Sequence, residues 1–426
     1  MSVTAESPSL VETVAGLSVE QLAQEFGTPL YVYDAAVIAE RIAELAAFDV
    51  VRFAQKACSN LAVLDLVRRH GGMVDAVSAG EIHRALRAGY QPGFHEPPQI
   101  VYTADIFDRQ ALDMVAELEI PVNCGSPDMI DQYGARCPGR GITLRVNPGF
   151  GHGHSQKTNT GGQQSKHGIW HEQLGECVER AAKSNVSIAG LHMHIGSGTD
   201  LEHLSQVCGA MEKAALSIGD SIHSISAGGG LSTPYRAGDK RVDVAAYYEL
   251  WNATRKKLAD AFGHPVSLEI EPGRYLSAES GALIAEIRAV KRMGDNLFYV
   301  VDAGFNNLAR PILYGAYHPM AICPAGGPRG SVGEKHDVII GGPLCESGDI
   351  FTQEEGGFVQ ARPLPPAEVG DYLIIGCAGA YGAVMGSNYN SKPLAAEVLV
   401  EDGQAHLVRE RQSLDDLVRG ERIPGE

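Results

Sequence analysis

Short apolar runs alternate with amphipathic, helix-like segments through the middle of the chain, and this alternation restricts the fold more than any other feature. A strand-length run followed by helical periodicity is typical of a βα unit, whose strands form a parallel sheet. Eight candidate strands fall between about residues 50 and 273, most of them followed by a helix: RFAQKA, GMVDAVS, QIVYTA, PVNC, GITLRV, IAGLHMH, SISAGGG and SLEIEPG. Eight such units predict an α/β fold built on a (β/α)8, TIM-type barrel.

An open, doubly wound sheet is the rival arrangement of the same elements. That fold usually carries a GxGxxG turn between its first strand and first helix, and no such turn opens a helix here. The barrel is therefore favoured. Its functional residues are expected at the carboxyl ends of the strands, where the loops of all eight units meet.

The pattern changes after Pro272, where strand-like pieces alternate with turn residues. The pieces are LFYVVDAG, DVIIGGPLC, DYLIIG and AEVLVEDGQAHLV. They predict a mainly β, Greek-key-like C-terminal domain. Near the N-terminus, Ser18 and Gln21 have capping-box spacing and Gly27 fits a helix stop. We expect an N-terminal segment packed on the β domain (1–30), the barrel (31–275) and the β domain (276–426).

The charge balance excludes two classes of partner. With 35 basic and 52 acidic residues the net charge is −17, which disfavours binding to nucleic-acid phosphates or to an anionic membrane. The N-terminus lacks a secretory pattern, and no run approaches the ~18 apolar residues of a spanning helix. A cytoplasmic protein acting on small molecules is expected. The 8 cysteines form no CxxC pair, so neither a metal site nor a disulfide framework is expected.

A lysine ends the first candidate strand. Lys56 follows the apolar run RFAQ, and a buried amine in such a place can form a Schiff base with an aldehyde. Most lysines at strand ends are simply solvated, so the position alone is a weak signal. It gains weight because other chemically capable residues also end strands and should meet Lys56 at one mouth of the barrel. They are Asp75, Arg145, His194, the run Gly228, Gly229 and Gly230, and Glu271.

Three interpretations of the HMHIGSG stretch are open. His192 and His194 share one face of a strand, which suits a pair of metal ligands. A hydrogen-bonded core histidine is the commoner case. The third interpretation is an imidazole stacked on a flat ring, and it requires only His194, with Ser197 and Gly198 as small neighbours.

Two glycine-containing turns suggest an anion site beside these residues. Successive backbone N–H groups in SAGGGLS can approach a phosphate, and the last strand loops of a barrel are a common phosphate site. In EIEPGRY, Glu271 and Arg274 flank a turn that contains Gly273. A carboxylate can pair with a protonated pyridine nitrogen, and arginine suits a phosphate or a carboxylate. Together with Lys56 and His194, this set describes a pyridoxal phosphate site rather than a zinc hydrolase.

Further polar residues lie in the β domain and in one long loop. The β-domain stretches contribute Asp302, Arg310, Tyr314, Cys345, Glu346, Asp349 and Tyr381. Nearby carboxylates raise a thiol's pKa, so Cys345 is expected to act as a neutral proton donor rather than as a nucleophile. The polar, glycine-rich segment 149–168 has the length of a functional lid or binding loop.

At these residues the chain resembles the diaminopimelate decarboxylase family, pyridoxal phosphate enzymes with an alanine-racemase-like barrel and a C-terminal β domain. The resemblance extends from about Tyr31 to Val400. Asn307 and Lys392 depart from the family pattern, which leaves the shape of the pocket and the dimer contacts open. The matching stretches are FAQKACSN, VDAVSAGEI, LRVNPGFGHGHSQKTNTGG, SKHGIW, HMHIGSG, SAGGGLS, EPGRYL, VDAGFNNLARPILYGAYH, GPLCESGD, GAYG and SNYN.

The resemblance implies an activity and a role for each candidate residue. The activity is pyridoxal phosphate-dependent decarboxylation of meso-diaminopimelate to L-lysine and CO2, in a homodimer with shared sites. Carboxynorspermidine decarboxylase, arginine decarboxylase, a racemase and a non-catalytic carrier of the cofactor are the alternatives. Lys56 would bind the cofactor covalently, His194 would stack on its ring and Glu271 would pair with the ring nitrogen. Ser197, Gly230, Gly273 and Arg274 would hold the phosphate, with Tyr381 nearby, and Cys345 would donate a proton. The substrate would be bound by Glu346, Arg274, Arg310, Tyr314 and Tyr381, the first four at its distal end.

Overall fold

The computed structural model describes residues 3–151, 161–194, 200–327 and 333–425. The chain forms two compact units, each described here by itself. The barrel unit consists of Ala39–Ser232 and Lys240–Tyr275. The β unit consists of Met1–Ile38, Thr233–Asp239 and Leu276–Glu426. The chain thus leaves the barrel unit briefly at Thr233–Asp239 before returning to it.

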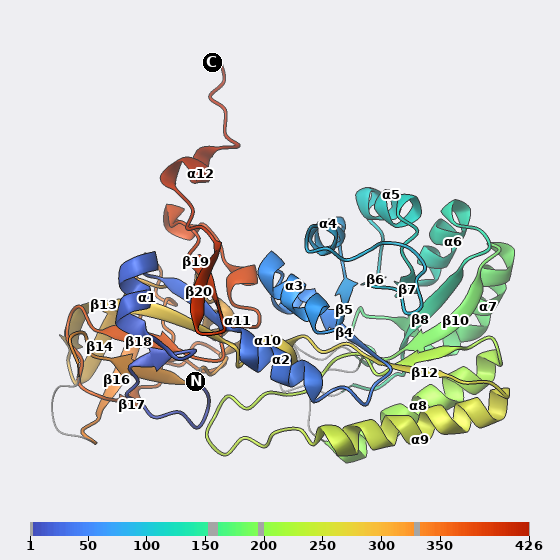
Figure 1. The fold of residues 1–426 in the computed structure, drawn as a ribbon, viewed down its shortest axis with the longest axis horizontal. Helices are drawn as coiled ribbons and strands as arrows, with labels where there is room; N and C mark the ends of the chain where they lie inside the picture. The colour runs from blue at the N-terminus through green and yellow to red at the C-terminus, as the bar shows by residue number, and fades with distance from the viewer. Residues whose placement is uncertain (1–2, 152–160, 195–199, 328–332, 426) are drawn as a thin grey trace. The chain divides into compact units, whose positions relative to one another are not determined.

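All eight expected strands of the barrel are confirmed. They pair in parallel in the order β4-β5-β6-β7-β8-β10-β11-β12, and β12 pairs with β4 to close the ring (Figure 1). The short strand β9 (Ile169–Trp170) adds to β8. The bounds are β4 (Val50–Ala54), β5 (Met73–Ala76), β6 (Ile100–Ala104), β7 (Val122–Cys124), β8 (Gly141–Asn147), β10 (Ser187–His192), β11 (Ser224–Ser226) and β12 (Ser267–Ile270).

A buried ion pair reinforces the seam between the first and last strands of the barrel. Only two residue pairs of β12 and β4 are in register at this seam. Arg52 of β4 donates from Nε to Oε2 of Glu269 on β12 at 2.7 Å, and its side chain is 1% exposed. A second bond runs from Nη2 of Arg52 to Oε1 of Glu269. The bidentate geometry compensates the desolvation of both charges and ties the ends of the ring together.

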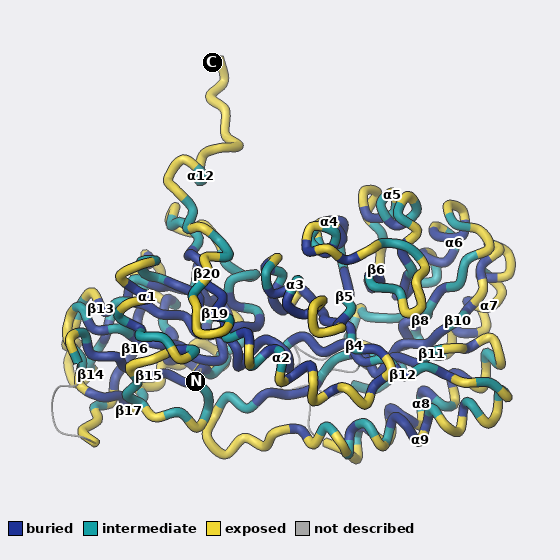
Figure 2. The backbone as a smooth tube through the Cα atoms, viewed as in Figure 1, coloured by how far each residue is buried: buried dark blue, intermediate teal, exposed yellow. Residues whose placement is uncertain are grey.

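The helices of the barrel unit lie outside the strands, with their exposed faces turned to solvent (Figure 2). Capping side chains fix several of their first turns, including Asn60 before α3, Ser78 before α4 and Asp243 before α9. The sequence patterns did not indicate α2, α7 or α10. The bounds are α3 (Leu61–Arg69), α4 (Ala79–Arg87), α5 (Arg109–Glu117), α6 (Pro127–Arg136), α7 (Leu174–Lys183), α8 (Leu201–Ile218) and α9 (Val244–Phe262). Two further helices, α2 (Ala35–Ala43) and α10 (Arg274–Ser277), each have residues in both units.

The β unit is built around one long strand that the sequence patterns did not identify, β13 (Gly281–Met293). Its first half is buried almost without interruption, so it lacks the alternation of a half-exposed strand. The sheet order is β17-β16-β14-β13-β3-β19-β20, with β18 pairing to β13 and β15. The other strands of this sheet are β3 (Leu30–Asp34), β14 (Asn296–Val301), β15 (Met320–Cys323), β16 (His336–Gly341), β17 (Arg362–Leu364), β18 (Tyr372–Ile375), β19 (Ala396–Glu401) and β20 (Gln404–Arg409).

One strand lies in a different unit from the one expected. The strand β3 (Leu30–Asp34) fell almost wholly within the expected barrel range 31–275, but it belongs to the sheet of the β unit. It pairs antiparallel with β13 and parallel with β19. Its side chains are nearly all buried, so an apolar run of this kind fits either unit equally well in sequence.

The N-terminal segment packs into the core of the β unit. Helix α1 (Val19–Phe26) begins at Ser18, whose hydroxyl accepts a bond from the Gln21 N–H, and ends at Gly27, as expected. Val19 and Leu22 of this helix join a buried cluster with residues of β3, β13 and β19. The segment therefore contributes to one hydrophobic core with the C-terminal strands. Among the helices that the structure describes, none is long and apolar enough to cross a membrane.

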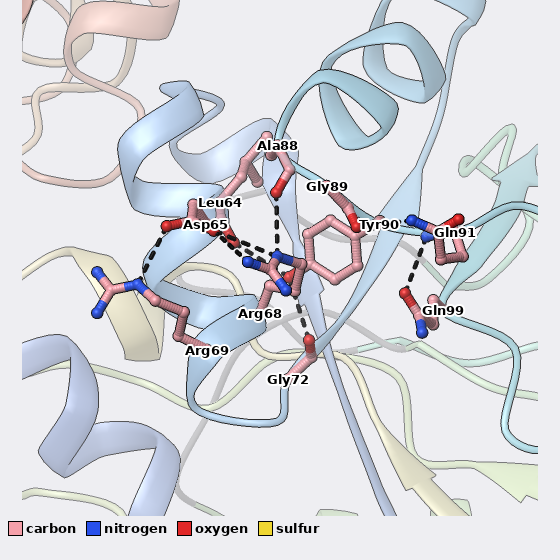
Figure 3. A network of polar contacts seen from close by, with 10 residues as sticks. All are labelled: Leu64, Asp65, Arg68, Arg69, Gly72, Ala88, Gly89, Tyr90, Gln91 and Gln99. Carbon is pink, nitrogen blue, oxygen red and sulfur yellow. Dashed lines mark hydrogen bonds and ion pairs between the residues drawn. The ribbon is translucent and has the colours of Figure 1, made fainter.

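A polar network joins α3 to the residues that follow α4 and to Gly72, which precedes β5 (Figure 3). The buried Tyr90 lies between two backbone carbonyls, with its hydroxyl 3.2 Å from the Leu64 oxygen and 3.1 Å from the Gly72 oxygen. A phenol has a single hydrogen, so the two carbonyls share it. Arg68 of α3 donates from Nε to the carbonyl of Ala88 at the end of α4. Burial raises the pKa of Tyr90, which keeps its hydroxyl a donor.

Tyr90→Phe is expected to lower the free energy of unfolding by about 1 kcal/mol, because one buried hydrogen bond is lost while the ring is kept. Urea denaturation of the purified variant checks this. Tyr248→Phe is the matched control, since that tyrosine is only half-buried. Equal stability of Tyr90→Phe and the wild type would contradict the assignment of this network.

Candidate active site

The residue after the first barrel strand is placed by a short turn. Lys56 lies in the 3-10 turn Gln55–Ala57, which follows β4 directly. The amine was expected to be buried, but Lys56 is exposed. It still lies close enough to Asp75, His194 and Glu271 to influence the ionisation of all three. The structure therefore gathers the expected lysine with three other expected residues of the barrel unit.

Glu271 follows β12 and is held from two sides. Its Oε2 lies 2.7 Å from Nε2 of His192, and its Oε1 accepts from the Ser226 hydroxyl at 3.1 Å. Glu271 is 6% exposed and His192 is 1% exposed. Burial by itself would raise the pKa of Glu271, but His192 and Lys56 bring it below its ordinary value. The carboxylate therefore stays ionised in a place from which water is largely excluded.

Of the three interpretations of the histidine pair, the structure supports a hydrogen-bonded core residue for His192. Its Nε2 is used by Glu271, which leaves Nδ1 buried with no partner among the described atoms. His194 has a different environment, two residues beyond the end of β10. Its Nδ1 accepts a hydrogen bond from the Gly229 N–H at 3.0 Å. Burial, with the Arg145 and Lys56 cations, holds the pKa of His194 well below its ordinary value, so the ring is neutral.

Asp75, in β5, is a buried carboxyl whose pKa is shifted in the opposite direction to that of Glu271. Burial and the Glu271 carboxylate raise its pKa well above the usual range, although Lys56 and Thr103 act the other way. Its Oδ1 is buried with no partner among the described residues. The pKa values of two carboxyls beside one amine are therefore shifted in opposite directions, a pattern common in active sites.

The glycine run is required by close packing as well as by its backbone conformation. A Cβ on Gly228 would lie 2.6 Å from the Met193 carbonyl oxygen, and one on Gly229 would lie 2.5 Å from the Glu271 carbonyl oxygen. The N–H of Gly228 donates to the Ser226 hydroxyl, and that of Gly229 donates to His194. Gly230 has a φ of 108°, and its N–H donates to neither the Ser226 hydroxyl nor the His194 ring.

Arg145, Gly273 and Arg274 complete the expected set in the barrel unit. Arg145 lies within β8, two residues before the strand ends, and is buried, and Arg274 begins α10 and is half-buried. A Cβ on Gly273 would lie 3.2 Å from the Ala54 carbonyl oxygen, so the turn approaches the end of β4 closely. Ser197 lies outside the described residues, as does the middle of the 149–168 loop.

The two ends of that loop are held by side chains of the barrel unit. The Asn147 amide donates to the carbonyls of Gly162 and His167, and its oxygen accepts from the N–H groups of Gly149 and Gly162. Asp105 accepts from the Gly168 N–H at 2.9 Å and lies 2.7 Å from Nδ1 of His167. The sequence patterns did not indicate either of these two anchors.

The other expected residues lie in the β unit. Arg310 and Tyr314 are the first and last residues of α11 (Arg310–Tyr314), one helical turn apart on the same face. Tyr381 is half-buried and has a φ of 56°, a left-handed conformation uncommon for tyrosine. Such an outlier persists only where the surrounding structure fixes it.

Cys345 and Glu346 lie at an exposed but well-braced loop of the β unit. The Cys345 N–H donates to Oδ1 of Asn390 at 2.7 Å. Asp349 accepts from the N–H groups of Leu344 and Phe305, both at 2.8 Å. The sequence identified Asp349 only as an acidic neighbour of the thiol and did not identify Asn390. Both hold the backbone that presents Cys345.

The residues of the barrel unit fit pyridoxal phosphate by the chemistry of the donors. An amine suits the aldehyde, the ionised Glu271 suits a protonated ring nitrogen, and the neutral His194 presents a flat ring. Both oxygens of Glu271 retain a second lone pair beyond the bonds to His192 and Ser226. The orphaned Oδ1 of Asp75 marks a further polar group without a partner in the described protein.

Comparisons with known proteins agree with this chemistry. A family model described as "Pyridoxal-dependent decarboxylase, pyridoxal binding domain" matches residues 36–278. Diaminopimelate decarboxylase of Escherichia coli (strain K12) is 54% identical over 413 residues, which cover 96% of this chain and 98% of that protein. The protein of the same name from Streptomyces coelicolor is 52% identical over 423 residues, which cover 99% of this chain and 96% of that protein.

Solved structures of such proteins share the fold along nearly the whole chain. A crystal structure of diaminopimelate decarboxylase matches with a TM-score of 0.93 at 54% identity, covering 97% of this chain and 99% of that one. The Helicobacter pylori enzyme of that name, complexed with L-lysine, matches with a TM-score of 0.82 at 30% identity. The match covers 94% of this chain and 98% of that one.

His192→Gln is expected to destabilise the chain by about 1 kcal/mol near neutral pH, because the flexible glutamine amide holds the buried Glu271 carboxylate less firmly than the fixed imidazole ring does. The pKa of Glu271 is lowered on folding, so its ionised form stabilises the protein above the unfolded-state value of about 4.3. That contribution is lost as the pH falls through the lower folded value. The difference between wild type and variant should therefore shrink on acidification, as measured by urea denaturation across pH.

His83→Gln, at an exposed position on α4, is the control for removing a histidine. It should match the wild type at every pH. A His192→Gln penalty that stayed constant from neutral to acidic pH would argue against the pairing with an ionised Glu271.

Proposed function

The chain belongs to the diaminopimelate decarboxylase family of pyridoxal-dependent decarboxylases, and from this premise we propose how its own residues decarboxylate meso-diaminopimelate to L-lysine and CO2. The observation that carries the proposal is the ionised, buried Glu271, held by His192 and Ser226 close to Lys56 and His194. When bound, pyridoxal phosphate supplies an electron sink for the pair of electrons left behind as the carboxylate departs as CO2.

Three side chains of the barrel unit prepare that cofactor. Lys56 would bind it through Nζ. Glu271 would accept a hydrogen bond from the ring nitrogen, and because its carboxylate remains ionised, it keeps a proton on that nitrogen. His194 would lie against the ring, and its neutral state avoids placing a second cation beside Lys56.

The phosphate would be held on the glycine side of the same unit. We assign it to the N–H of Gly230, the turn at Gly273 and the Arg274 guanidinium, with Ser197 and Tyr381 as further contacts. Gly228 and Gly229 would shape this turn through close packing, since their N–H groups already bind Ser226 and His194. Arg145 and Asp75 would be neighbours of the cofactor, and the Arg145 cation helps to hold the pKa of His194 low.

Residues of the β unit would supply the proton and recognise the substrate. The exposed Cys345 would donate the proton from Sγ to the carbon that loses its carboxylate. Arg310 and Tyr314 would bind the distal carboxylate, joined by Arg274, and Glu346 would bind the distal ammonium. These groups would disfavour ornithine, because ornithine would leave the charge of the buried Arg310 unpaired.

We further propose a homodimer in which Cys345 and Glu346 serve the site of the second copy. The exposure of both side chains in a rigidly braced loop supports this, since a proton donor must be covered to work in a dry site. We also propose that the protein acts in the cytoplasm. Its eight cysteines are thiols rather than disulfides, as a reducing compartment requires.

Neither arginine nor carboxynorspermidine decarboxylation is favoured over this activity, because the relatives at 54% and 52% identity are diaminopimelate decarboxylases over nearly their full length. A non-catalytic carrier of the cofactor would not need Arg310, Cys345 and Glu346. A racemase would want an arginine near the ring nitrogen, where this chain has Glu271.

The purified protein is expected to release CO2 and L-lysine from meso-diaminopimelate, and far less CO2 from ornithine or arginine. Borohydride reduction should attach the cofactor to the peptide that contains Lys56, as read by mass spectrometry. Lys56→Ala should lose both the attachment and the turnover, whereas the exposed control Lys183→Ala should keep both. Comparable rates on all three substrates would overturn the assignment of diaminopimelate.

Cys345→Ala is expected to lower kcat by about 10²-fold or more while changing KM little, because a positioned proton donor acts in the transition state. Steady-state kinetics with meso-diaminopimelate measure both constants. Ser347→Ala, in the same exposed loop, is the control. A kcat equal to that of the wild type would remove Cys345 from the role of donor.

A further inference from the structure

A buried histidine of the β unit holds Arg310 in a defined orientation. His318 is fully buried, and its Nδ1 lies 3.0 Å from the carbonyl oxygen of Gly376. Its Nε2 lies 3.0 Å from Nη1 of Arg310. A guanidinium only donates, so Nε2 must accept, and a carbonyl only accepts, so Nδ1 must carry the hydrogen. His318 is therefore fixed as the neutral Nδ1–H tautomer.

The same nitrogen of Arg310 has a second acceptor. Nη1 donates to the hydroxyl of Tyr235 at 3.0 Å, and Cζ lies 4.9 Å from the centre of the tyrosine ring. The Tyr235 and His318 rings meet edge to face, with centroids 5.4 Å apart and planes at 81°. The two hydrogens of Nη1 thus have one acceptor each, and the cation also rests on an aromatic face.

Tyr235 reaches this place through the short excursion of the chain at Thr233–Asp239. These seven residues group with the β unit although they lie between two long segments of the barrel unit. The Asp239 carboxylate braces the turn, since its Oδ2 accepts from the N–H of Tyr235 at 3.0 Å and from the N–H of Arg236 at 2.8 Å. The excursion therefore presents Tyr235 on a rigid turn.

We propose that Tyr235 and His318 are positioning residues that fix the Arg310 guanidinium for recognition of the distal carboxylate of the substrate. The inference rests on the proposed role of Arg310 and deepens it. Anchoring Nη1 at two acceptors fixes the plane of the guanidinium, and hence the direction in which its remaining N–H groups point. A carboxylate needs that plane to form two parallel bonds, so loss of either anchor weakens recognition without touching the reacting carbon.

The proposal predicts which ligands depend on the two anchors. L-Lysine keeps the distal carboxylate of diaminopimelate, whereas 1,5-diaminopentane lacks it. Binding of L-lysine should therefore depend on Tyr235 and His318, and binding of 1,5-diaminopentane should not. If Tyr235 and His318 had only a structural role, their loss would weaken the binding of L-lysine and of 1,5-diaminopentane equally.

The test compares Tyr235→Phe, His318→Gln and His318→Leu holoenzymes with the wild type. Tyr235→Phe removes only the hydroxyl, and we expect a KM for meso-diaminopimelate about tenfold higher, the factor that corresponds to ~1.4 kcal/mol. The kcat should stay within about threefold, because the interaction is made equally in the ground and transition states. The inhibition constant of L-lysine should rise by a similar factor, and that of 1,5-diaminopentane should not change.

Matched variants separate positioning from general damage. Tyr317→Phe removes a neighbouring hydroxyl whose ring contacts Arg236 and Arg362 rather than Arg310, and it should behave as the wild type. A glutamine can accept from Arg310 and donate to Gly376, so His318→Gln should retain more affinity than His318→Leu. Tyr235→Phe should add little to the defect of Arg310→Ala, because the two residues act as one unit.

Unchanged KM and L-lysine inhibition in Tyr235→Phe would overturn the inference, as would equal weakening of L-lysine and 1,5-diaminopentane. If His318→Leu does not fold, Tyr235→Phe and His318→Gln still decide the question. Failure of the proposed function has a different signature: the wild type itself would release no CO2 from meso-diaminopimelate. Direct binding of L-lysine and 1,5-diaminopentane to the holoenzymes, measured by titration calorimetry, then reports on the anchors without any turnover.

Discussion

The chemistry of this protein depends on keeping one buried carboxylate ionised. Moving a charge out of water is costly unless its partners are close and well oriented. Glu271 meets that requirement through His192 at the end of β10 and Ser226 at the end of β11, with Lys56 nearby. Glu271 itself follows β12, and the strands β10, β11 and β12 are neighbours in the ring. The pairing of β12 with β4 closes the barrel and brings Lys56 to the same place. The glycines that follow β11 allow the approach, because a Cβ there would collide with the Met193 and Glu271 carbonyl oxygens.

The two units divide the chemistry between them. The barrel unit carries the groups that suit the cofactor, and they are set by strand ends and by burial. The β unit carries the groups assigned to the substrate, and they are set by braced loops: Asp349 and Asn390 around Cys345, and Tyr235 and His318 around Arg310. In both units a side chain that is assigned to the reaction is oriented by a neighbour with no assigned contact to the reactants. Rigid support of this kind holds reacting groups in a productive geometry.

Much of the fold could be predicted because it follows local patterns. The eight barrel strands, the Ser18 cap and the stop at Gly27 rest on residues close together in the sequence. The patterns did not indicate β13, since a strand buried on both faces has no alternation, and they placed β3 in the wrong unit. They identified His194 and Glu271 as candidates but left His192 open between a metal ligand and a hydrogen-bonded core histidine. Its function as the partner of Glu271 depends on a contact across 79 residues of sequence.

The sequence by itself determined the βα repeat, the strand ends and the residue types there, because hydrophobic periodicity and turn chemistry are local properties of the chain. From these the amine, the carboxylate and the imidazole of a pyridoxal phosphate site could be named. Only the tertiary structure decided the charge of each group, because protonation depends on burial and on neighbours that are distant in sequence. It raised the pKa of Asp75 and lowered that of Glu271, left Lys56 exposed, and selected one tautomer of His318.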